Sequence, residues 1–302
     1  MTWVTLQASD DPTRPRAVSW NEYRVWLLRE WDSLLASGGG EKPVQKFLEA
    51  HPSLLPGATD DVGPGGHHGA SLHSVISQPE LQGLGRRRYP DFMWVRRDTA
   101  AIRPICIEIE DPAKRWFNPR SQTPTAELTE ALDQLIEWKV WFSKPENQSI
   151  FLKTYAPDFT FRTLEPQYVL IYGRDAEFRP AESPHADSAY MRAKRNFMGR
   201  DNEHFYTFDS LKPVAEARDY GTLTRSVRGW DLKALPPTFT THPIMRELFE
   251  VISRPEAALA KVPLIDDARR AYVAERWAHW RTQIQQNRQG EITVTATGGE
   301  GE

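Results

Sequence analysis

The sequence predicts an α/β (α+β) protein in which a mixed sheet is flanked by helices and followed by a helical C-terminal extension. Two observations support this prediction. Residues 91–97 and 102–110 both alternate between apolar and polar side chains around a short polar loop, which is typical of a β-hairpin. Residues 168–172, 188–198 and 204–208 have the patterns of a strand, a helix and a strand, and a unit of this size implies a parallel crossover.

Helices are expected before and after the hairpin. Ser19 and Glu22 form a capping-box pattern, and apolar side chains then recur at helical spacing. A second, shorter helix is expected over residues 41–50, where a following proline stops it. Thr123 and the proline after it begin a third helix in the favoured order of cap and proline, and we expect this helix to continue to about Ser143.

The chain divides into five expected segments. These are a flexible arm at residues 1–18, the main domain at 19–215, a linker at 216–243, a helical extension at 244–289 and a disordered tail at 290–302. The helices of the extension fit two roles. They either form an oligomer or partner surface, or cap the sheet.

Composition and charge limit the functional classes. Of 302 residues, 39% are hydrophobic and 26% charged, which is typical of a soluble globular protein. Because 38 basic and 41 acidic residues leave a net charge of −3, any nucleic-acid contact must be a local patch. The single cysteine, Cys106, excludes an internal disulfide. There is no apolar run suited to export or membrane insertion, so we expect a cytoplasmic protein without a membrane partner.

The hairpin is expected to carry two carboxylates on one face. Along residues 105–110 the isoleucines fall on one face of the strand, while Glu108 and Glu110 fall on the other. If residues 98–101 form the loop, Asp91 lies opposite Glu108, where like charges destabilise the pair. A bound Mg²⁺ or Mn²⁺ would remove this penalty. Alternatively, both acids are solvated at strand ends, or a one-residue shift in register turns Asp91 to the other face.

Motifs around the hairpin resemble those of a known family. Tyr89-Pro90-Asp91-Phe92 followed by Ile107-Glu108-Ile109-Glu110 resembles the PD-(D/E)XK nuclease signature. In order and spacing the chain resembles the Shedu family of bacterial anti-phage nucleases at residues 41–52, the hairpin, the helix with Gln134, and the strands 168–174 and 206–211. This resemblance implies Mg²⁺-dependent endonuclease cleavage of DNA, which we expect to be double-stranded, and assembly into homo-oligomers.

The resemblance also implies roles for individual residues. It assigns metal ligation to Asp91 and Glu108, an accessory acid to Glu41 and a supporting role to Gln134, for which a capping contact to backbone is the alternative. The chain departs from the family pattern at Glu110, where the pattern has lysine. Glu110 can bind metal or act as a general base, and Lys114 can supply the missing cation. An inactive site retained as a DNA-binding or sensor surface is the alternative.

A basic turn precedes the hairpin. Arg86, Arg87 and Arg88 lie directly before the proposed site, and arginine forks pair well with phosphate oxygens. Lys114 and Arg115 can extend this patch. We therefore expect these residues to contact DNA. The alternatives are a solvated turn or salt bridges to a neighbouring subunit.

Overall fold

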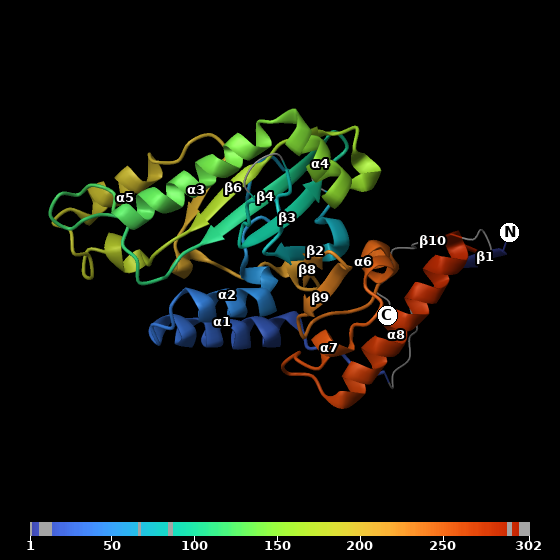
Figure 1. Ribbon diagram of the computed structural model, residues 1–302. Helices are drawn as coiled ribbons and strands as arrows, with labels where there is room; N and C mark the ends of the chain where they lie inside the picture. Colours follow the sequence, from blue (N-terminus) through green and yellow to red (C-terminus); the bar gives the residue numbers. More distant parts are fainter. Residues whose placement is uncertain (1, 6–13, 66–67, 84–86, 289–291, 296–302) are drawn as a thin grey trace.

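The computed structural model describes residues 2–5, 14–65, 68–83, 87–288 and 292–295 (Figure 1). The strands of its main sheet are β2 Ser74–Ser77, β3 Phe92–Arg97, β4 Ala101–Ile109, β5 Thr163–Leu164, β6 Gln167–Ile171, β7 Glu203–Tyr206, β8 Gly221–Ser226 and β9 Gly229–Ala234. They lie in the order β7-β6-β4-β3-β2-β8-β9, with β5 beside β4. Parallel and antiparallel pairs are mixed, which confirms the predicted fold class.

Helices cover both faces of the sheet. The helices α1 Trp20–Ala36 and α2 Glu41–Ala50 lie on one face, and α3 Ala126–Phe142, α4 Pro145–Tyr155 and α5 Ser188–Asn196 lie on the other (Figure 1). Short 3₁₀ helices occur at Pro52–Leu54, Ser71–His73, Pro157–Phe159, Asp175–Phe178, Phe208–Ser210, Ala215–Ala217 and Pro243–Met245. Each face of the sheet therefore has its own hydrophobic core.

The helix starts follow from local sequence. The Ser19 hydroxyl accepts a hydrogen bond from the Glu22 N–H (3.3 Å), and the Ser19 N–H donates to the Glu22 carboxylate (3.1 Å), which completes the predicted capping box. The helix predicted from Thr123 begins later, with Thr125 as its cap. Pro124 instead forms an isolated antiparallel bridge with Phe117, so the chain is still extended at this proline.

The hairpin has the predicted register. Arg97 lies opposite Ile102, and Phe92 lies opposite Ile107. Side chains of β4 alternate between the two cores, with Ile107 on the α1 side and Cys106 on the α3 side. The predicted parallel crossover is also present, since β6 and β7 pair in parallel.

The segment 216–243 is not a linker. It contains β8 and β9, and β8 pairs in parallel with β2 from Ser74 opposite Gly221 onward. Polar and glycine residues dominate β8, so it lacks the apolar alternation that identifies a strand, whereas β9 shows this alternation over only five residues, 230–234. Their pairing depends on β2, which lies about 150 residues earlier in the chain.

The C-terminal helices pack beside this end of the sheet (Figure 1). They are α6 Arg246–Val251, α7 Glu256–Leu259 and α8 Asp267–Arg288. Leu223 of β8 and Leu235 after β9 join Leu248 and Trp277 of these helices in a third core. The extension thus caps the sheet, and a further role as an oligomer surface stays a prediction. Within the described residues, no helix is long and apolar enough to cross a membrane.

The predicted arm and tail are described only in part. Thr2–Thr5 forms β1 and Ile292–Thr295 forms β10, and these two strands pair in parallel. Residues 1, 6–13, 289–291 and 296–302 lie outside the described part of the chain. Both predictions therefore omitted a pairing that joins the two ends of the sequence.

Candidate functional site

Three carboxylates lie at the carboxyl end of β4, a central strand of the sheet. Asp91 directly precedes β3, while Glu108 and Glu110 lie at the end of β4. Because Phe92 pairs with Ile107, the register places Asp91 opposite Glu108, as predicted. The backbone N–H of Ile109 donates to Asp91 Oδ2 (2.9 Å) and fixes the orientation of this carboxylate.

Glu108 of the opposed pair is buried, and Asp91 is half-buried. Glu108 is 7% exposed, and its Oε2 atom is buried without a hydrogen-bond partner. Burial, together with the charges of Asp91, Glu110 and Glu41, raises the pKa of Glu108 well above its usual value. Burial also raises the pKa of Asp91 to about 7, although the hydrogen bond from Ile109 acts in the opposite direction. The pair therefore needs a proton or a cation near neutral pH.

A fourth acid approaches from α2. Glu41 is the first residue of this helix, and burial followed by the charge of Glu110 raises its pKa. The preceding Gly40 has a φ of 72°, and a Cβ there would lie 3.4 Å from Asp111 Oδ2. That distance is an ordinary van der Waals contact, so it is the positive φ that favours glycine where the chain enters α2, and Glu41 then lies within range of the charge of Glu110.

Lys114 lies beside Glu110, as the sequence suggests. Its Nζ atom is 2.5 Å from Glu110 Oε2 in an i,i+4 ion pair. Burial acts against the charged form of Lys114, but the hydrogen bond and charge of Glu110 outweigh it, so the pKa of Lys114 is raised. The ammonium group of Lys114 is therefore present at the site, where it compensates the charge of Glu110.

The donor set fits a divalent cation in part. Asp91 and Glu108 provide opposed oxygen ligands, and the unpartnered Glu108 Oε2 is suited to a hard cation. Among the described residues, no group of three or more His, Cys, Asp or Glu side chains is arranged to hold a metal ion. The charges of Glu110 and Glu41 raise the pKa of Glu108, and the metal-binding roles of these two acids stay predictions.

Comparison with known protein families gives a match over residues 39–211 to the C-terminal region of the Shedu protein SduA. The chain belongs to the Shedu family. The matched region covers more than half of the chain and contains Glu41, Asp91, Glu108 and Glu110. Membership of this family indicates a role in anti-phage defence. A comparison with curated proteins gives no match.

In this Shedu protein Gln134 is not bound to the acid pair. It lies on α3, which covers the same face of the sheet as Cys106, and its side chain is half-buried. No hydrogen bond joins it to Asp91 or Glu108 among the described residues. Its supporting role stays a prediction.

Two arginines of the predicted basic patch form ion pairs with acidic residues of the same chain. Arg86 lies outside the described residues. Arg87 pairs with Glu80 (2.9 Å) yet remains 71% exposed, whereas Arg88 pairs with Glu137 of α3. The side chain of Arg115 is exposed. Arg87 and Arg115 are therefore the residues of this patch best placed to meet a phosphate.

Tyr172 and Thr125 also belong to the rim of the site. The hydroxyls of both donate to the backbone carbonyl of Arg115, at 3.3 and 2.8 Å, and so hold the loop that carries Lys114. Sequence analysis did not single out either residue. Tyr172 could have been found, because it directly follows β6, and the carboxyl ends of the parallel strands β4 and β6 meet at the same edge.

Proposed function

We propose that this Shedu protein is a Mg²⁺-dependent endonuclease that cleaves double-stranded DNA in anti-phage defence. The observation that supports this proposal is the opposition of the half-buried Asp91 and the buried Glu108, with one carboxylate oxygen of Glu108 left without a partner. Two like-charged groups at this position are costly unless a proton or cation compensates them. The resemblance of the hairpin to the PD-(D/E)XK signature favours the cation.

We assign a proposed role to each of the four acidic residues and to Lys114. Asp91 and Glu108 would hold Mg²⁺ or Mn²⁺, which when bound polarises a phosphate oxygen and lowers the pKa of water. A water that attacks the phosphorus would give its proton to Glu110, while the bond to the leaving oxygen breaks and that oxygen takes a proton from solvent. Lys114, beside Glu110, provides positive charge where negative charge develops on the phosphate. Glu41 strengthens the attraction of the site for a cation.

A cleavage assay tests this function. Purified full-length protein is incubated with supercoiled and linear DNA in Mg²⁺, in Mn²⁺ and in EDTA. We expect nicking or cutting with either metal and none in EDTA. Cleavage that persists in EDTA would show that the opposed carboxylates are not a metal-dependent catalytic centre.

A second function is favoured by one observation. Glu110 replaces the lysine of the family pattern, and its carboxylate is already paired with Lys114. The alternative is a DNA-binding or sensor module that does not cleave. It predicts salt-dependent DNA binding without cleavage in either metal, and a gain of cleavage in Glu110→Lys. Cleavage by the unmodified protein excludes it.

Arg115→Ala is expected to weaken DNA binding without changing its sequence preference. An exposed arginine that contacts phosphate contributes through charge, so the slope of log affinity against log salt should fall by about 1. Fluorescence anisotropy at several salt concentrations measures this slope. Arg228→Ala, which removes an equal charge from the exposed turn between β8 and β9, is the matched control. An unchanged slope in Arg115→Ala would remove this residue from the DNA-binding surface.

We propose that the protein forms a homo-oligomer, as the family resemblance implies, and that it is cytoplasmic, as its single cysteine and its lack of an apolar run suggest. The C-terminal helices α6 to α8 are the proposed surface for this assembly. Light scattering on the full chain tests it, with a mass above that of one 34.7 kDa chain as the expected result. A monomer at every concentration would contradict it.

A further inference from the structure

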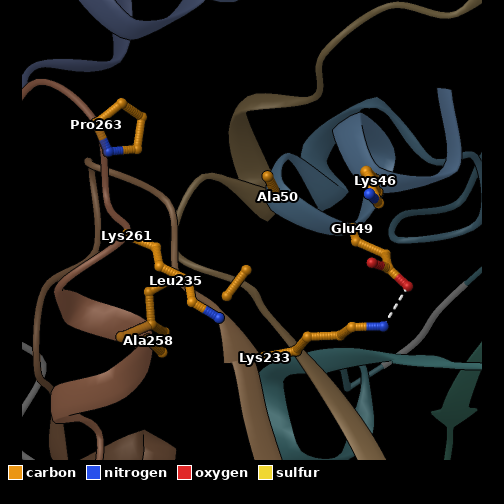
Figure 2. A pocket seen from close by; sticks show the side chains of 9 residues that line it. Lys46, Glu49, Ala50, Lys233, Leu235, Ala258, Lys261 and Pro263 are labelled. Atoms are coloured by element: carbon orange, nitrogen blue, oxygen red, sulfur yellow. Dashed lines mark hydrogen bonds and ion pairs between the residues drawn. The ribbon is translucent and has the colours of Figure 1, made fainter. Parts of the chain in front are cut away.

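A pocket with a volume of about 290 Å³ lies between α2, β9 and the residues that follow α7 (Figure 2). It is separate from the acid cluster. Glu41 begins α2, whereas Lys46, Glu49 and Ala50 line the pocket from its last turns. Eight residues of helix separate Glu41 from Glu49, which corresponds to about 12 Å.

Three lysines give the pocket a positive charge. Lys46, Lys233 and Lys261 reach it from α2, β9 and the segment after α7, and Glu49 is the only carboxylate among its lining residues (Figure 2). Lys233 pairs with Glu49 Oε1 (2.5 Å). Lys46 and Lys261 are exposed and have no carboxylate partner in the described part of the chain. The pocket therefore has two cations available for an anion.

The Glu49 carboxylate is held in place by one of its oxygens. Oε1 accepts hydrogen bonds from Lys233 and from the Ser77 hydroxyl (2.6 Å). Figure 2 shows the second oxygen turned toward the pocket. Glu49 thus presents an oriented hydrogen-bond acceptor to a ligand, beside the lysines.

The remaining lining is apolar. Ala50, Leu235 and Pro263 form walls without hydrogen-bonding side chains on opposite sides of the pocket (Figure 2). Its volume of about 290 Å³ lies at the lower limit of the range usual for ligand pockets, about 300–1,000 Å³, so the pocket can hold no more than one small molecule. A ligand that fits this lining combines a flat apolar group with a negative charge and a hydroxyl donor.

We propose that this pocket binds a mononucleotide. The base lies between the apolar walls, the phosphate pairs with Lys46 and Lys261, and a ribose hydroxyl donates to Glu49. Lysine ammonium groups act as point charges that neutralise phosphate without demanding a fixed geometry. Contacts between the base and the apolar walls add specificity for a nucleotide, which the phosphate contacts alone do not provide.

Isothermal titration of the full chain with AMP in EDTA tests this site. EDTA prevents binding through a metal at Asp91 and Glu108, so the result does not depend on the proposed nuclease function. We expect a dissociation constant below about 1 mM for AMP. Adenosine and inorganic phosphate each provide only part of the ligand, and each is expected to bind at least tenfold more weakly.

Two variants locate the site. Lys46→Ala with Lys261→Ala is expected to weaken AMP binding at least tenfold. Lys153→Ala with Lys212→Ala removes the same charge from exposed lysines outside the pocket, and its affinity should stay within twofold. Ala50→Phe fills the pocket without changing charge and should also abolish binding, with thermal melting as the check that it folds.

Three results would overturn the proposal. The first is no binding of AMP at millimolar concentration, and the second is equal affinity in the Lys46/Lys261 variant and its control. The third is binding of a 5′-phosphorylated oligonucleotide but not of AMP, which would assign the lysines to a DNA end.

Discussion

Glu108→Gln is expected to lower metal-dependent DNA cleavage by at least ~10²-fold while leaving the fold intact. Glutamine has the same shape as glutamate but lacks the charge that would attract a cation. It also removes the repulsion between Glu108 and Asp91, so the structural cost is small. The initial rate of plasmid nicking in Mg²⁺ measures the effect. Asp91→Asn should behave alike, because its amide oxygen can still accept from the Ile109 N–H.

Glu130→Gln is the matched control for this experiment. Glu130 is an exposed residue of α3, and the same chemical change there should leave the rate within twofold. Equal rates in Glu108→Gln and in the unmodified protein would contradict the proposed metal-binding pair. A loss in both variants would point to a general defect of the preparations.

The combined variant Asp91→Asn with Glu108→Gln is expected to gain stability relative to the unmodified protein as pH rises from 5 to 8. Burial raises the pKa of Asp91 to about 7, so the folded state holds this proton more tightly than the unfolded state. The stability that follows is fully present below the unfolded pKa of about 4 and is lost as pH rises through about 7. The raised pKa of Glu108 acts in the same direction.

Urea unfolding in EDTA at each pH measures the difference in free energy between the two proteins. The variant lacks both titrating carboxyl groups. Between pH 5 and 8 its free energy of unfolding should therefore rise relative to that of the unmodified protein by at least ~1.4 kcal/mol, the equivalent of one pKa unit. Burial lowers the pKa of His51 and of His73 to about 4, which changes stability in the opposite sense between about pH 4 and 6.5. Both histidines are present in both proteins, so their effect cancels.

Addition of Mg²⁺ at pH 8 provides a further comparison. A cation that binds the folded state stabilises the unmodified protein, and the variant should show a smaller gain. A free-energy difference that does not vary with pH would contradict the raised pKa values of the pair. Equal stabilisation of both proteins by Mg²⁺ would place the cation elsewhere.

The sequence alone determined the hairpin and the opposed acids. Strand side chains alternate with a period of two, so the positions of the isoleucines and of the short loop were sufficient to predict that Arg97 pairs with Ile102. The capping box at Ser19 is equally local. These features depend on residues that are close in the chain, and this is why they could be predicted.

Features that depend on distant segments could not be predicted in this way. The strand β8 lacks apolar alternation and is a strand because β2 and β9 are available to pair with it. Arg88 forms an ion pair with Glu137, which lies on α3, a helix that begins 38 residues after Arg88 in the chain. Burial of Glu108 depends on the elements that pack on its own face of the sheet, the face of Cys106, so its pKa has no signature in the sequence.

The same distinction applies to the two candidate sites. Periodicity in one hairpin predicted Asp91 opposite Glu108, and only the assembled sheet buries Glu108 and brings Glu41 close. The mononucleotide pocket has no local signal, because Lys46, Lys233 and Lys261 are far apart in the chain. Local patterns specify backbone conformation and side-chain direction, whereas burial and the meeting of distant charges are set by how the elements pack.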